Sequence, residues 1–263
     1  MKVSFLNGRI VADGYFYEDV PYDVSANNLS VCFDGKGGLS KYLSVRSGKN
    51  YSQRSMFSLY KNGEQIGAYT KKQTKMAGRI QEICLLGDGY RVEMKQFITK
   101  EDDAVFVDMT FTTEENTDFT VVYGIGDSWV IPAFSCAFPY KLEQENMRFE
   151  LDVNVCGEKH IQFVVAYEEN QAYCDWLLGS FREKAEAANN EIIRRYYNAL
   201  CQQRKGTPCD EEINKIKLLM NQSAINIKQR KCIQAALDRA AETEGPATAI
   251  ELCDGRMVTG KTS

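Results

Sequence analysis

The stretch at residues 87–124 reads GDGYRVEMKQFITKEDDAVFVDMTFTTEENTDFTVVYG. Apolar and polar residues alternate through Tyr90–Phe97, Ala104–Phe111 and Phe119–Tyr123. A period of two is typical of strands with one buried face, because successive side chains point to opposite faces of a sheet. Gly87-Asp88-Gly89 precedes the first run and tolerates the positive φ angles of a tight turn. The stretch therefore predicts consecutive antiparallel strands.

The same pattern continues on both sides of this stretch. Met147–Val155 alternates cleanly, and His160–Tyr167 is a more continuous apolar strand. Pairs of turn-forming residues separate the runs at Asn62-Gly63, Glu115-Asn116 and Cys156-Gly157. Many short strands with regular turns predict an antiparallel β-sandwich, and we place it at residues 1–175.

The apolar period changes after residue 175. Residues then recur at spacings of three and four, as on one helical face, at Trp176, Leu177, Phe181, Ala185, Ala188, Ile192, Ile193, Tyr196, Tyr197 and Leu200. Gly206-Thr207-Pro208 ends this helix, Asp210 caps the next, and a third helix spans 228–243. A hairpin turning at Asp254-Gly255 follows. The predicted fold class is α+β, with a helical segment at 176–263 that ends in this β-hairpin.

Composition also divides the chain into two parts. Of the 29 aromatic residues, 26 lie in residues 1–180. That part has 18 Lys and Arg against 25 Asp and Glu, whereas residues 181–263 have 14 against 11. Neither part has the clustered basic surface that nucleic-acid binding requires, so we expect no nucleic-acid partner. We interpret the chain as two unrelated pieces joined near residue 190.

The chain offers few signals of location or of metal binding. No run of 18 apolar residues is present, and the first residues do not resemble a signal peptide, so we expect a cytoplasmic protein without a membrane span. The nine cysteines include no CxxC pair, and His160 is the only histidine. Reduced thiols are therefore expected, and no metal site is predicted.

The titratable clusters do not predict an active site. We interpret Glu101-Asp102-Asp103 and Glu168-Glu169 as solvated turns, with nothing nearby to raise a pKa. His160 is expected at a strand start. The lysine-rich run at residues 71–75 is expected to be a solvated loop or an edge strand. The sequence therefore predicts no catalytic, cofactor-binding or metal-ligating residue, and no cofactor.

The C-terminal part resembles an uncharacterised bacterial family. The similarity is carried by EIIRRYYNALCQQRKG (191–206), EEINKIKLLMNQSAI (211–225) and AIELCDGRMVTGKTS (249–263). These stretches resemble an internal segment of the domain-of-unknown-function family 1846, whose members are much longer α/β proteins. The resemblance implies no known activity. The family continues beyond the end of this segment, and its nucleotide-binding-like first half has no counterpart here.

Residues 3–179 resemble an accessory domain of carbohydrate enzymes. The similarity is carried by LSVCFDGKGGLSKY (29–42), NGEQIG (62–67) and the stretch at 87–124. Their order is similar to that in the N-terminal β-sandwich of glycosidases and phosphorylases with an (α/α)6 barrel. Residues 173–188 look like the linker helix that leads into the barrel in those enzymes, and no barrel follows. The resemblance implies a carbohydrate-enzyme accessory domain without its catalytic partner.

One motif suggests a nucleotide site. Residues 255–262, GRMVTGKT, match GxxxxGK[ST], in which backbone N–H groups wrap phosphates and the lysine reaches the β/γ oxygens. Only Ser263 follows Thr262, so the helix that such a loop requires is missing. Asp254-Gly255 lies between alternating apolar stretches, which favours a hairpin over a phosphate-binding loop. ATP binding through Lys261 remains an alternative.

We therefore interpret the chain as non-catalytic, a fusion or fragment that joins an accessory sandwich to part of an uncharacterised family. A carbohydrate-binding module is a second alternative, because exposed aromatic rings can stack on sugars. Tyr15, Phe16, Tyr17 and Trp129 are the candidates for this stacking, although core packing is the commoner fate of an aromatic in a strand. Uncovered apolar faces of the helical segment would favour self-association.

Overall fold

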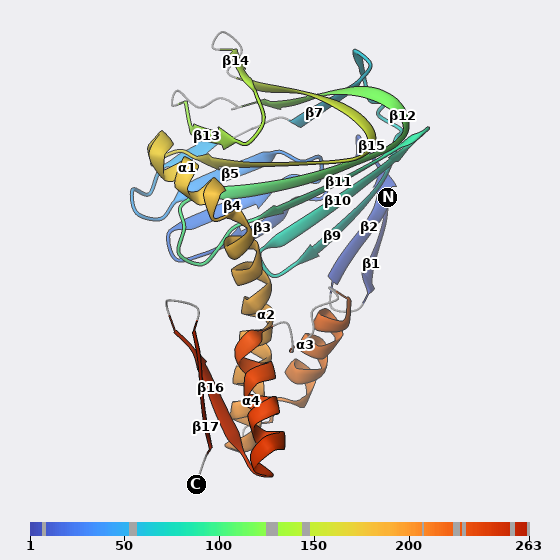
Figure 1. Ribbon diagram of the computed structural model, residues 1–263. Coiled ribbons are helices and arrows are strands. Elements are labelled where there is room, and N and C mark those ends of the chain that lie inside the picture. The colour runs from blue at the N-terminus through green and yellow to red at the C-terminus, as the bar shows by residue number, and fades with distance from the viewer. Residues whose placement is uncertain are drawn as a thin grey trace. The chain divides into compact units, whose positions relative to one another are not determined.

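A computed structural model of the chain describes residues 1–6, 9–52, 57–124, 131–143, 148–206, 208–222, 227, 230–252 and 256–261. These residues form two compact units, Met1–Ala188 and Asn189–Ser263. Figure 1 shows the strands of the first unit and the helices and hairpin of the second. The class is α+β, as the sequence predicted.

The first unit is built mainly of strands. Their bounds are β1 Lys2–Leu6, β2 Arg9–Tyr15, β3 Tyr22–Ser25, β4 Leu29–Phe33, β5 Leu39–Ser44, β6 Asn50–Ser52, β7 Phe57–Lys61, β8 Glu64–Gln65, β9 Lys71–Ala77, β10 Ile80–Gly87, β11 Tyr90–Phe97, β12 Val105–Gly124, β13 Ala133–Cys136, β14 Lys141–Glu143 and β15 Arg148–Ala166. Every pairing among them is antiparallel.

The strands form two sheets. The large sheet has the order β1-β2-β9-β10-β11-β12-β15-β13, with β7 attached to β12, β8 attached to β7, and β14 attached to β15. The small sheet has the order β3-β4-β5-β6. Apolar residues of both sheets share one buried cluster, so the sheets enclose a common core. The predicted antiparallel β-sandwich is confirmed.

The predicted turns at Glu115-Asn116 and Cys156-Gly157 are wrong. Both pairs lie inside the long strands β12 and β15, which pair on both sides of an irregularity at these residues. Thr113 pairs with Gly157, and the register shifts before the ladder continues at Thr117. Gly157 has a φ of +83°. A glycine at positive φ lets a strand bend at a bulge without ending, so the two strands curve together and continue (Figure 1).

Two helices cover part of the other face of the large sheet. They are α1 (Gln171–Gly179) and the beginning of α2 (Phe181–Arg204). The ring of Phe181 packs edge-on against Phe97 and Phe106, with ring centroids 5.6 and 5.5 Å apart. These rings belong to a second buried cluster, which also includes Leu177. The α1–α2 connection is therefore fixed to one end of this sheet face.

The predicted single apolar helix face is only partly correct. The helix is interrupted at Ser180, so the residues before and after this break do not continue one regular face. Leu177 is fully buried, whereas Trp176 is 57% exposed and Tyr197 is 63% exposed. The Lys184 ammonium lies 4.9 Å from the centre of the Trp176 ring. A cation–π contact at the surface therefore replaces the core packing expected for Trp176.

The second unit comprises the end of α2, α3 (Asp210–Gln222), α4 (Lys231–Thr243), β16 (Ala247–Glu251) and β17 (Met257–Lys261). Small buried clusters join α2 to α3 through Ile193 and Met220, and through Ala199 and Ile213. The predicted terminal hairpin is confirmed by the pairing of β16 with β17. Helix α4 has no buried residue among those described.

Candidate ligand-binding groove

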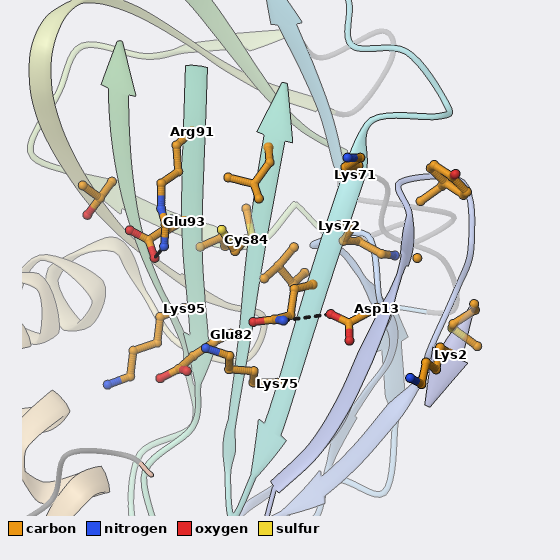
Figure 2. A pocket seen from close by; sticks show the side chains of 18 of the residues that line it. Lys2, Asp13, Lys71, Lys72, Lys75, Glu82, Cys84, Arg91, Glu93 and Lys95 are labelled. Carbon is orange, nitrogen blue, oxygen red and sulfur yellow. Dashed lines mark hydrogen bonds and ion pairs between the residues drawn. The ribbon is translucent and has the colours of Figure 1, made fainter. Parts of the chain in front are cut away.

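An open groove of about 900 Å³ lies on the outer face of the large sheet. It runs over β1, β2, β9, β10, β11 and β12, and Figure 2 shows the side chains that line it. Most of the lining residues are charged or polar: Lys2, Asp13, Lys71, Lys72, Gln73, Lys75, Glu82, Arg91, Glu93, Lys95, Asp108 and Thr110. These residues come from six strands, β1, β2, β9, β10, β11 and β12.

Strand alternation places these side chains together. On β11, Val92 and Met94 belong to the core between the sheets, so Arg91, Glu93 and Lys95 point to the opposite face. The ladders align the neighbouring strands in two rows across this face. One row is Asp13, Gln73, Cys84, Glu93 and Thr110, and the other is Lys75, Glu82, Lys95 and Asp108.

The prediction that residues 71–75 form a solvated loop or an edge strand is wrong. They belong to β9, which pairs with β2 on one side and with β10 on the other. Lys72 is only 4% exposed. Its ammonium donates to the carbonyl of Gly35 at 2.6 Å and to that of Glu18. Two backbone acceptors compensate for burial of this charge, so a lysine fits inside a central strand.

The described carboxylates of the groove lie against partners within the protein. Arg9 pairs with Glu82 at 2.8 Å, and Arg91 pairs with Glu93 at 2.7 Å. The bond from Arg91 lowers the pKa of Glu93. His160 pairs with Asp108, and the amide of Gln73 donates to Asp13 at 2.8 Å (Figure 2). The groove's negative charges are therefore already engaged.

The groove lysines differ from its carboxylates. The ammonium groups of Lys71, Lys75 and Lys95 make no hydrogen bond and no ion pair with the described residues. The Lys95 ammonium lies 5.8 Å from the centre of the Phe97 ring. Burial lowers the pKa of Lys95, although the carboxylates of Glu82 and Asp108 oppose this shift. The groove therefore presents ammonium groups that can still donate hydrogen bonds to a ligand.

Three exposed tyrosines form a cluster at the end of the groove where Tyr15 lines it. Tyr15 and Tyr17 are stacked with ring centroids 6.2 Å apart, and Tyr69 contacts them edge-on at 5.9 and 5.4 Å. Their exposed fractions are 42% for Tyr15, 49% for Tyr17 and 75% for Tyr69. We call these three residues the tyrosine platform.

Backbone hydrogen bonds hold the tyrosine platform in place. The Phe16 amide donates to the Thr70 carbonyl at 2.9 Å, and the Tyr17 amide donates to the Ala68 carbonyl at 3.0 Å. The Tyr15 amide donates to the Glu18 carboxylate at 2.8 Å. Phe16 is buried in the core. Because Phe16 is fixed in the core, Tyr15 and Tyr17 on either side of it point outwards.

The structure places the four residues predicted to stack on sugars in different environments. Tyr15 and Tyr17 lie at the surface together, and Phe16 is removed from the set because it is a core residue. Trp129 lies outside the described residues. The sequence pattern missed Tyr69, which precedes the lysine-rich strand and contacts both other rings.

The acidic clusters predicted as solvated turns are only partly solvated. Glu101 is exposed as predicted, whereas Asp103, Glu168 and Glu169 lie around Arg46, which corrects the prediction for these three. Asp102 is 6% exposed and Asp103 is 8% exposed. The Arg46 guanidinium lies 3.2 Å from the Asp103 carboxylate and 2.7 Å from that of Glu169. Burial raises the pKa of Asp103, and the positive charge of Arg46 opposes the shift. Contacts between residues far apart in sequence bury Asp102 and Asp103, whereas the Arg46 side chain stays 57% exposed.

Glu168 and Lys184 complete the Arg46 cluster. Glu168 accepts hydrogen bonds from the hydroxyls of Ser44 and of Tyr51, the latter at 2.6 Å. Burial acts to raise the pKa of Glu168, but hydroxyl donors and Arg46 lower it to about 2. Lys184 on α2 pairs with Asp102 at 2.9 Å. The cluster joins the β5–β6 connection, the loop before β12, the segment between β15 and α1, and α2, which is a structural role.

The remaining sequence hypotheses concern His160, metals and the GxxxxGK match. His160 lies within β15 rather than at a strand start. The part of the chain that the structure describes contains no group of three metal-ligating side chains. Gly260 and Lys261 lie in β17, opposite Thr248 and Ala247. That extended pairing differs from a loop wrapped around phosphates, and Gly255 and Thr262 lie outside the described residues.

None of the described helices is both long enough and apolar enough to cross a membrane.

Part of the chain is similar to an uncharacterised protein family. Over 78 residues it is 42% identical to a UPF0371 protein of Corynebacterium efficiens and 45% identical to a UPF0371 protein of Streptococcus uberis. The match covers 30% of this chain and 16% of each relative. The chain thus spans about one sixth of the length of these relatives. No family model matches the chain.

Two solved structures have limited likeness to the chain. YidC from Thermotoga maritima has a TM-score of 0.33 and 14% identity, with coverage of 72% of this chain and 58% of that one. An active YidC insertase structure with the first transmembrane domain resolved has a TM-score of 0.31 and 12% identity, with coverage of 92% and 60%.

Proposed function

We propose that the first unit is a non-catalytic carbohydrate-binding domain that takes an oligosaccharide along the groove. The tyrosine platform is the observation that carries this proposal. Three large rings are exposed together at the groove end, although exposed apolar groups in soluble proteins usually occur singly. Exposed aromatic clusters beside polar side chains are typical of binding sites.

The fixed geometry of the tyrosine platform supports sugar stacking. A pyranose ring presents C–H groups on its faces and hydroxyls at its rim, so it pairs with a flat aromatic surface that is bordered by hydrogen-bonding groups. The backbone bonds at Phe16 and Tyr17 fix the platform before any ligand arrives. Such preorganisation reduces the entropy that binding costs.

The groove next to the tyrosine platform supplies groups for the hydroxyl rim. Gln73, Thr110 and Glu93 lie in one row across the sheet. Amide, hydroxyl and carboxylate groups can donate to or accept from sugar hydroxyls. An open groove that crosses six strands suits a chain of sugar units better than a single small molecule.

The pairing of the groove carboxylates supports binding rather than cleavage. Glycoside hydrolysis generally needs one carboxyl group as an acid and another as a base or nucleophile, both free to face the scissile bond. In the groove, Arg9 holds Glu82, Arg91 holds Glu93, and His160 holds Asp108. We therefore assign the first unit as a glycosidase-like accessory sandwich.

For the second unit we propose a segment of an uncharacterised bacterial family, the one catalogued as domain of unknown function 1846. The 78-residue similarity to UPF0371 proteins, which covers 30% of the chain, supports an uncharacterised family segment of this size. We assign this unit no ligand.

The test is to titrate the protein with immobilised and then soluble oligosaccharides, using Tyr17→Ala and Tyr69→Ala. Truncation of a stacking tyrosine should weaken binding about tenfold, the usual scale for an aromatic anchor. Tyr197→Ala is the matched control, because Tyr197 is 63% exposed but lies in the second unit. Absence of binding to every oligosaccharide, or equal binding by all three variants, would refute the proposal.

A further inference from the structure

We propose that the groove selects acidic oligosaccharides, those that carry uronate, sulfate or phosphate groups, through Lys71, Lys75 and Lys95. The inference rests on the proposed carbohydrate-binding function and adds the charge class of the ligand. It follows from which charged groups of the groove already have a partner within the protein. The described carboxylates are engaged, whereas these three ammonium groups have no hydrogen-bond or ion-pair partner among the described residues.

The positions of two lysines suit a ligand with spaced negative groups. Lys75 and Lys95 flank Glu82 in one row of the sheet, because β9 and β11 lie on either side of β10. Two strand spacings separate their backbones by about 10 Å. Arg9 already neutralises Glu82 between them at 2.8 Å. The two ammonium groups can therefore meet separate acidic groups along one chain.

Lys71 connects the cationic groups to the tyrosine platform. It is exposed and lies directly across the ladder from Tyr15. A sugar unit stacked on Tyr15 therefore has a cation beside it. Stacking and ion pairing would act on the same unit, and a neutral sugar would gain only the stacking.

Partial burial makes Lys95 a stronger contributor than a fully solvated lysine. Solvent screens ion pairs less where the groups are partly buried. The Lys95 ammonium, which lines the groove, lies 5.8 Å from the centre of the buried Phe97 ring. Partial burial disfavours the charged form of Lys95. A negatively charged ligand would stabilise this charged form, whereas a neutral ligand would not.

The same lysines would also attract a nucleic acid, but the groove suits a sparser charge. A nucleic-acid backbone carries a phosphate at every unit. Asp13 and Glu93 share the row between the tyrosine platform and Lys95, and they would repel a continuous series of phosphates. The chain also has a net charge of −4. An oligosaccharide that carries acidic groups only at intervals can place its neutral units next to these carboxylates.

The first step of the test is an array of neutral, uronate-containing, sulfated and phosphorylated oligosaccharides, with a single-stranded DNA oligomer included. The strongest acidic ligand and its neutral parent are then titrated at low and high salt. We expect preferential binding of acidic sugars, with affinity for them falling as salt rises. The double variant Lys75→Gln/Lys95→Gln should lose about tenfold or more, and Lys71→Gln should lose less.

Lys49→Gln is the control, because Lys49 is exposed and lies outside the groove lining. If the double variant fails to fold, the affinity of Lys71→Gln for the acidic sugar alone tests the proposal. Lys71 is exposed, so this substitution should leave folding intact. Equal binding of neutral and acidic sugars with loss in Tyr69→Ala would overturn the acidic selectivity and leave carbohydrate binding standing. Binding of no sugar overturns both proposals. Lysine-dependent binding of the DNA oligomer alone also overturns both and assigns the groove to nucleic acid.

Discussion

Tyr15 at the end of β2 and Lys71 at the start of β9 are direct cross-strand neighbours. One residue provides an exposed ring and the other an exposed cation on the same groove wall. They are 56 positions apart in the chain, so only the ladder between β2 and β9 brings them together. This pair connects the tyrosine platform to the cationic groove.

Phe16→Ala should reduce both stability and sugar binding. Phe16 is the buried anchor between two outward tyrosines, and truncation of a core phenylalanine costs about 3–5 kcal/mol. Loss of the anchor also frees Tyr15 and Tyr17 from their fixed positions. Chemical denaturation and sugar titration measure the two effects. Phe16→Leu should retain most of both properties, and unaltered sugar affinity in a folded Phe16→Ala variant would argue against preorganisation.

Gly157→Ala should destabilise the first unit through the backbone alone. Gly157 has a φ of +83°, and an added Cβ would meet no atom within 4 Å. The expected cost is about 1–2 kcal/mol, the energy of a non-glycine residue in the left-handed region. Gly179→Ala is the control, since Gly179 ends α1 with an equally open Cβ position and no positive φ. Denaturation midpoints measure both, and a neutral Gly157→Ala would disprove the glycine bulge.

The first unit should lose stability in acid partly through Glu168. Its pKa is about 2 in the folded protein, below the ordinary value of 4.5. A lowered folded pKa stabilises the protein above pH 4.5, and this contribution disappears as the pH falls from 4.5 towards 2. Glu168→Gln should lower the melting temperature at neutral pH and flatten the decline below pH 4.5. Parallel melting curves against pH for the two proteins would contradict this assignment.

Limited proteolysis should cut the second unit before the first. Among the described residues, α4 buries no side chain, whereas the first unit has a continuous core between its two sheets. Segments with few buried apolar contacts open locally at low free-energy cost. Mass spectrometry of the early fragments locates the cuts. Early cuts within β9–β12, or equal resistance of both units, would contradict the expectation.

Alternation in the sequence predicted the strands because each strand has one face in the core. The run at 90–97 became β11, and the turn at Gly87-Asp88-Gly89 became the β10–β11 hairpin. The turn predicted at Cys156-Gly157 failed for a reason that local sequence does not contain. Pairing with β12 keeps β15 extended on both sides of the glycine.

The groove and the Arg46 cluster were less predictable than the strands. Arg46 and Glu169 lie 123 positions apart, and no local pattern signals their contact. Lys72 was interpreted as solvated because its neighbours are lysines, whereas carbonyls from two distant loops hold its ammonium. Tyr69 does not lie in an alternating run of the sequence, so the periodicity did not identify it. Its proximity to a turn and to Lys71 was the only available clue.

The most direct test of the account is calorimetric titration of the strongest array oligosaccharide into the protein and into Tyr69→Ala. Tyr69 is 75% exposed, so its truncation should leave folding intact. The account predicts saturable binding to the parent protein and about tenfold weaker binding to Tyr69→Ala, with an unchanged melting temperature. Equal affinity of the two proteins would contradict a carbohydrate site at the tyrosine platform.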